Sequence, residues 1–199
     1  MGTDISGFVE CRARYGGGEW QAAIDLELIL DSRDYDAFGC LFGVRNYANF
    51  RPLAAGRGLP ADVSAAVPAA RDGLPLRSDT TWIGWDELAA VDWDEPAEDT
   101  DSRLHQFRQT EHGPRFVGKA GWSARFAEAL GLTPPAPGEP LPTWPEDTEW
   151  QIGDTRYRAV RLTRREAVGP QWQPLLALMS TLGGLHGAEN VRLVVWFDD

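Results

Sequence analysis

Six arginines between positions 33 and 77 are the residues of this sequence whose type and spacing suggest chemistry most clearly. Together with four aspartates they give this segment a net charge of +2, whereas the rest of the chain carries −13. An arginine guanidinium group is planar and can bind a carboxylate or phosphate through two parallel hydrogen bonds. Several such groups on an irregular segment could converge on an anionic ligand. They could also pair with nearby acids and fix the conformation of the segment.

Two carboxylates and one tryptophan complete the candidate site. Asp4 and Asp62 are the candidate catalytic residues, because a carboxylate beside arginines stays ionised and can accept a proton. Either one could instead be a structural partner of an arginine. Trp82 could close the site by stacking on a flat ligand, although tryptophan also fills cores and interfaces. The candidate ligand-binding residues are Arg33, Arg45, Asn46, Arg57, Arg77, Ser78 and Trp82.

Established catalytic motifs are missing from the sequence. It contains no phosphate-binding loop, dinucleotide-binding glycine pattern, nucleophile elbow or zinc-protease motif. Its two cysteines, Cys11 and Cys40, and its three histidines do not have the spacing of a metal site. The sequence therefore predicts no metal ligand and assigns no cofactor.

The net charge of −11, from 30 acidic and 19 basic residues, limits the possible partners. An acidic surface repels nucleic-acid phosphates and anionic lipid headgroups, so we expect neither a nucleic acid nor a membrane as partner. The predicted partner is either an anionic small molecule bound at the arginine segment or a basic protein. Six acids at positions 92–101 predict an exposed, solvated loop.

Cysteine content and the opening of the sequence bear on the compartment. Two cysteines do not form a disulfide framework in a chain of 199 residues, which favours a reducing environment. The first residues lack the basic and apolar regions of a signal peptide, and no run approaches the roughly 18 apolar residues of a membrane span. The expected location is the cytoplasm.

Hydrophobic patterning predicts an α+β fold with a mostly antiparallel sheet and a few helices packed against it. Strands are expected at 5–14, 20–30 and 191–197, and a glycine-rich connection joins the first two. Helices are predicted from Asp34 to a stop at Gly43, from Ser123 to Gly131 and from Pro174 to Gly183. The other predicted elements are helical turns at 62–70 and 85–90 and a hairpin at 150–162. No linker divides the chain, so residues 1–199 are expected to form a single domain with a long irregular segment at 44–80.

Several short motifs resemble a family of uncharacterised phage and bacterial proteins that open with Met-Gly-x-Asp-Ile. The matching segments are MGTDI at 1–5, SRDYDAFGCLFGVRN at 32–46, RGLPADVS at 57–64, RSDTTW at 77–82 and VRLVVWFDD at 191–199. The resemblance implies a common fold and no known activity. In that family a histidine often follows Asp-Ile and a His-Ser pair precedes the tryptophan. Ser6 and Arg77 occupy those positions here, so any chemistry of those histidines is expected to be lost.

Two functions are compatible with these observations. The first is a small-molecule site or enzyme that holds an anionic ligand with arginine, aspartate and tryptophan side chains. The second is an acidic interaction protein, such as an immunity factor or inhibitor, that docks on a basic partner. Its basis is the net charge, the acidic run at 92–101 and nine tryptophans, a residue type favoured in binding hot spots.

Overall fold

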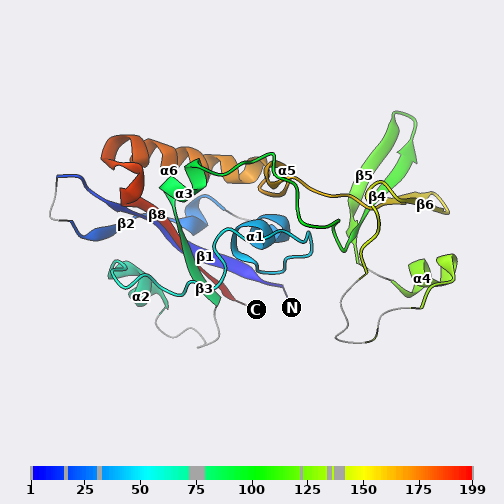
Figure 1. Cartoon of the computed structure of the whole chain (residues 1–199), viewed down its shortest axis with the longest axis horizontal. Coiled ribbons are helices and arrows are strands. Elements are labelled where there is room, and N and C mark those ends of the chain that lie inside the picture. The colour runs from blue at the N-terminus through cyan, green and yellow to red at the C-terminus, as the bar shows by residue number, and fades with distance from the viewer. Residues whose placement is uncertain are drawn as a thin grey trace.

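Two antiparallel sheets of four strands each are present in the part of the chain that the computed structural model describes (Figure 1). The predicted α+β fold class is confirmed, with the strands divided between two sheets. The described residues are 2–15, 18–30, 33–71, 79–121, 123–133, 136 and 142–198.

The first sheet has the strand order β2-β1-β8-β3. Its C-terminal strand β8 lies in the middle, paired antiparallel to β1 on one side and β3 on the other, and seven of its eight residues are buried. Residues 193–197 of this strand form a continuous apolar run, as is typical of a strand that is covered on both faces. The strands are β1 (Asp4–Arg12), β2 (Trp20–Asp25), β3 (Asp79–Gly84) and β8 (Val191–Asp198).

Five α-helices lie around this sheet among the described residues: α1 (Tyr35–Phe42), α2 (Ala66–Arg71), α3 (Trp85–Ala89), α5 (Arg164–Ala167) and α6 (Gln173–His186). The predicted start and stop of α1 are confirmed. The Asp34 side chain accepts a hydrogen bond from the Ala37 amide, and Gly43 ends the helix at a φ of 77°. No helix within the described ranges is both long and apolar enough to cross a membrane.

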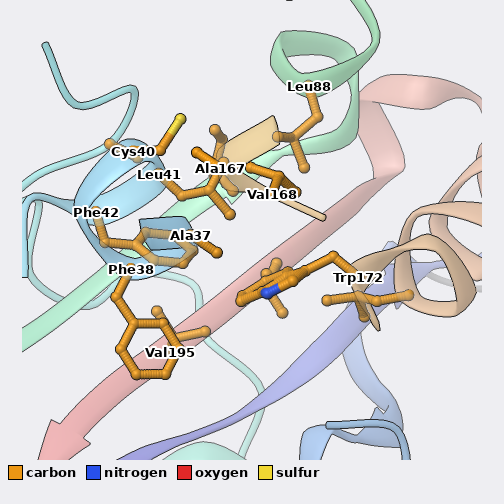
Figure 2. Packing of buried hydrophobic residues seen from close by; sticks show 14 of the residues in the cluster. Ala37, Phe38, Cys40, Leu41, Phe42, Leu88, Ala167, Val168, Trp172 and Val195 are labelled. Atoms are coloured by element: carbon orange, nitrogen blue, oxygen red, sulfur yellow. The ribbon is translucent and has the colours of Figure 1, made fainter. Parts of the chain in front are cut away.

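The main core lies between α1, β8 and the segment around Trp172 (Figure 2). Phe38 is fully buried, and its ring lies 5.2 Å from that of Phe197 and 6.4 Å from that of Trp172, centre to centre. Phe42 contacts the same two rings. Edge-to-face and tilted aromatic pairs of this kind add to the stability gained from apolar burial.

Two predicted boundaries in this part of the chain are wrong. The strand expected at 20–30 ends at Asp25, whose side chain caps a 3-10 helix at Leu26–Leu28. Helix α6 does not stop at Gly183 but continues to His186. A Cβ atom at Gly183 would lie 2.5 Å from Cδ1 of Trp85, so this glycine allows α3 and α6 to approach closely.

The second sheet has the strand order β5-β4-β7-β6 and a small core on one face. Leu104, Phe126 and Ala159 are buried there, with Trp150 and Tyr157 packed against them. The hairpin of β4 and β5 was not predicted, because its residues alternate weakly between apolar and polar. The elements are β4 (Leu104–Thr110), β5 (Gly113–Ala120), α4 (Ala124–Leu130), β6 (Glu149–Ile152) and β7 (Thr155–Arg158).

A charged cluster, which we call the junction, connects the two sheets. Asp36 on α1 pairs with Arg103 and with Lys119 on β5, whose Nζ lies 2.6 Å from Asp36 Oδ2 and 3.1 Å from Asp101 Oδ2. The Asp101 side chain is fully buried and also accepts hydrogen bonds from Arg103. Asp101 belongs to the acidic run that was expected to be a solvated loop; for this residue the expectation is wrong, because two cations compensate its burial.

Candidate functional site

Charged and aromatic side chains gather on the face of the first sheet that is turned toward α2. In the register of the sheet, Glu10 on β1 and Gly84 on β3 both lie opposite Arg192 on β8. This row therefore runs from a carboxylate to a guanidinium group to a residue with no side chain. A Cβ atom at Gly84 would lie 2.3 Å from Asp86 Oδ1, so the missing side chain lets the Asp86 carboxylate lie against the end of β3.

Arg192 is held from several sides. Its Nε donates to Glu10 Oε2 at 2.7 Å, and its two terminal nitrogens donate to Oδ1 and the backbone oxygen of Asp62 at 2.7 and 3.1 Å. Its guanidinium carbon lies 3.8 Å from the ring centre of Trp20 and 5.9 Å from that of Trp82. Glu10 and Arg192 are both buried, so the pair fixes the sheet and the loop above it. With its nitrogens bound in this way, Arg192 is a structural cation rather than a free anion receptor.

A hollow of about 370 Å³ opens beside this pair. We call it the Trp20–Trp82 hollow, after its two aromatic walls. The side chains that give it its chemistry are Trp20, Trp82, Arg192 and the four carboxylates Asp62, Asp86, Glu87 and Glu189. Four acids against one arginine make the lining net negative, which favours a cation over an anion.

Two of these four carboxylates are available to a ligand. Asp62 already binds Arg192 and accepts a hydrogen bond from Trp20 Nε1 at 2.9 Å. Glu87 is bound by Arg57. Across the described ranges, no basic side chain pairs with Asp86 or Glu189, and both are exposed. The hollow thus has two carboxylates whose charge no described basic side chain neutralises, although Glu189 accepts a hydrogen bond from the Asn190 side chain at 3.3 Å.

Of the two predicted catalytic residues, Asp62 lies at this hollow. Hydrogen bonding from Arg192 holds the pKa of the Asp62 carboxyl below its ordinary value. A general base works best with a pKa near the operating pH, so this carboxylate is a weak base and a good partner for a cation. Trp82, predicted as a ligand-binding residue, lies at the same hollow, and Arg57 lies over its ring at 5.3 Å.

Asp4, Arg33 and Arg45 form a second group elsewhere. Arg33 donates to both oxygens of Asp4 at 2.6 and 2.8 Å, which lowers the pKa of Asp4, and Arg45 donates to Thr3 Oγ1 at 2.8 Å. Asp4 lies opposite Asp198, at the far end of β8 from Arg192. Arg192 and Asp198 are six positions apart along β8, which corresponds to about 20 Å in an extended strand. The predicted site residues therefore divide between two places.

Asn46 has a structural role in the loop after α1. Its side-chain nitrogen donates to the Phe50 backbone oxygen at 2.7 Å, and its side-chain oxygen accepts from the Phe50 amide at 3.1 Å. These two bonds close a turn in the irregular segment. The remaining predicted ligand-binding residues, Arg77 and Ser78, lie outside the described residues.

Sequence reasoning missed Glu10, Trp20 and Arg192 as parts of the site, and also the acids Asp86 and Glu189. The sequence did contain a signal for Glu10 and Arg192. Glu10 stands between the apolar residues Val9 and Cys11, and Arg192 precedes an apolar run; a charge buried in a strand needs a partner. Trp20, Asp86 and Glu189 carry no comparable signal, because exposed acids and tryptophans are common elsewhere in the chain.

Within the described ranges there is no group of three or more histidine, cysteine or acidic side chains placed to hold a metal ion. Comparison of the chain with protein-family models, curated proteins and solved structures gave no match. The charges and aromatic walls of the Trp20–Trp82 hollow are therefore the features that bear on function.

Proposed function

We propose that this chain is a binding protein whose Trp20–Trp82 hollow receives a positively charged side chain of a basic protein partner. The observation that supports this most directly is that two exposed carboxylates, Asp86 and Glu189, line the hollow with two tryptophans and pair with no basic side chain among the described residues. A cation between aromatic walls gains from the ring quadrupole as well as from the carboxylates. The net charge of −11 would attract a basic partner from a distance.

The anionic-ligand hypothesis has less support from the geometry. Two of its described arginines are already bound to acids at separate places: Arg33 binds Asp4 and Arg57 binds Glu87. An anion at the hollow would also face the negative charges of Asp86 and Glu189. These contacts favour the second of the two functions that the sequence left open.

A calorimetric titration with a defined basic peptide tests the proposal. The probe is an acetylated, amidated peptide of alternating lysine, arginine and glycine, titrated at low and at moderate salt. The double variant Asp86→Asn/Glu189→Gln removes the two free charges of the hollow. We expect it to weaken binding about tenfold, equivalent to about 1.4 kcal/mol.

The matched control is Glu111→Gln/Glu128→Gln, which removes two exposed charges from the second sheet region instead. Both double variants change the net charge equally, so a difference between them reports the hollow itself. Equal weakening by the two would show general charge attraction and contradict a site. Absence of binding by the unmodified protein at low salt would contradict the proposal outright.

A further inference from the structure

The hollow already has a guanidinium group of its own at one edge. Arg57 Nη1 lies 3.1 and 2.7 Å from the two carboxylate oxygens of Glu87, and its guanidinium carbon is 5.3 Å from the ring centre of Trp82. Glu87 and Trp82 both line the hollow. Arg57 therefore makes the two contacts, carboxylate and aromatic ring, that a partner's arginine would make there.

The geometry of these contacts suits a guanidinium group better than an ammonium group. A planar guanidinium can lie over an indole ring while its edge donates to a carboxylate, and it is less strongly hydrated than an ammonium. Arg192 shows the same combination in the same hollow, with a tryptophan ring at 3.8 Å and a carboxylate at 2.7 Å. Trp82 and Glu87 together form what we call the guanidinium subsite.

The side chain of Arg57 can leave this subsite without unfolding the loop. Its backbone is fixed separately, because its amide donates to Thr81 Oγ1 at 3.3 Å and the next amide, that of Gly58, donates to the Thr80 oxygen at 3.1 Å. The side chains of Arg57 and Glu87 are 29% and 43% exposed. Displacing the side chain breaks this ion pair and the hydrogen bond that Arg57 Nη2 donates to the Leu53 backbone oxygen at 3.0 Å. Partly exposed contacts of this kind contribute little net stability, so one guanidinium group can be exchanged for another at low cost.

We infer that Arg57 is an intramolecular competitor that occupies the guanidinium subsite, and that an arginine of the basic partner binds by replacing it. This inference rests on the proposed function, because it concerns the same hollow. A competitor within the chain lowers the apparent affinity by the fraction of molecules in which the subsite is open. Removing the competitor must therefore tighten binding of an arginine.

The variants Arg57→Ala and Arg57→Lys test this by calorimetry, with an arginine peptide and a lysine peptide of otherwise identical sequence as probes. Arg57→Lys retains the positive charge but lacks the planar fork. We expect Arg57→Ala to bind the arginine peptide about threefold to tenfold more tightly than the unmodified protein does. Arg57→Lys should show part of this gain, and the lysine peptide should gain less in both variants.

Arg51→Ala is the matched control. Arg51 is also an exposed arginine of the irregular segment, paired with a glutamate, Glu95, at 3.5 Å, but neither residue lines the hollow. Its removal changes the net charge by the same amount. Thermal melting of all variants verifies that the fold is retained.

A gain in Arg57→Ala no larger than in Arg51→Ala would overturn the inference, as would equal gains for the two peptides. Those results would leave the proposed function intact if binding still depended on Asp86 and Glu189. The proposed function itself fails if neither peptide binds any of these proteins. The two failures are therefore distinguishable in one set of titrations.

Discussion

The two sheets of this protein differ in how completely their faces are covered. The central strand β8 of the first sheet is buried on both faces, whereas the edge strand β5 of the second is mostly exposed, with Phe116 and Val117 open to solvent. The core of the first sheet draws on α1, α6 and the segment around Trp172, while α4 and the segment at Trp144 supply that of the second. Because burial of apolar surface drives folding, we expect the first sheet to carry most of the stability.

The two regions also differ in charge. Residues 102–159, which hold the second sheet, contain seven basic and seven acidic residues, so the entire net charge of −11 belongs to the rest of the chain. The Trp20–Trp82 hollow lies in this acidic part. The charge that would attract a basic partner and the site proposed to receive it therefore belong to the same region of the chain.

Contact between the regions is largely polar. The junction of Asp36, Asp101, Arg103 and Lys119 joins them, and the main hydrophobic clusters remain separate on either side. Charged groups that are mostly buried stabilise a structure only while each has its partner. A substitution in one core should therefore leave the other core packed, whereas a substitution at the junction should weaken the attachment of the two regions to each other.

The largest expected effect comes from the first core. Phe38→Ala should lower the free energy of unfolding by about 3–5 kcal/mol, because Phe38 is fully buried among aromatic rings. Chemical denaturation measures this loss.

In the second core, Phe126→Ala should lower amide protection of β4 and β7 while β1 and β8 stay protected in hydrogen exchange. Equal loss of protection in both sheets would contradict separate cores.

A smaller effect is expected at the junction. Lys119→Met keeps most of the side-chain length but leaves Asp36 and Asp101 with Arg103 alone. We expect a loss of about 2–3 kcal/mol in urea denaturation, below the value for a fully buried pair because Asp36 is partly exposed. The control Arg158→Met removes a more exposed cation paired with Asp147 and should cost less than about 1 kcal/mol. Similar losses in the two variants would count against a special role of the junction.

The smallest expected effect is a dependence on acid. Burial alone would raise the pKa of Asp101, but hydrogen bonds from Arg103 and the charges of Arg103 and Lys119 hold it below its ordinary value. A carboxyl whose pKa is lowered by folding stabilises the protein above its unfolded pKa of about 3.9, and this contribution is lost as the pH falls.

From neutral pH to pH 4 this single group should account for a loss of about 0.4 kcal/mol, which grows at lower pH. Denaturation curves at several pH values measure it, as the difference in slope between the unmodified protein and Asp101→Asn. If the variant kept the same pH dependence below pH 4, other carboxyls would be responsible.

Local signals were sufficient for much of the first region. The capping aspartate Asp34, the stop at Gly43 and the apolar run of β8 are each set by neighbours in the sequence, and the structure has them where they were predicted. The β4–β5 hairpin gave no such signal, since its partly exposed strands have little apolar patterning. Helix α6 continues past Gly183, and this glycine lies against Trp85, about one hundred residues earlier in the chain, a contact that no local pattern indicates.

For the candidate site, the sequence by itself determined the chemistry of the parts: many arginines, an excess of acids, Trp82 and Asp62. Only the tertiary structure decided which of them meet. Strand register placed Glu10 opposite Arg192, and Arg192 brought Asp62 beside Trp20 and Trp82. The tertiary structure also paired Arg33 with Asp4, at the other end of β8. The physical reason is that a guanidinium group binds whichever carboxylate lies close to it in the fold. Which carboxylate lies close depends on the pairing of strands and loops that are far apart in the sequence.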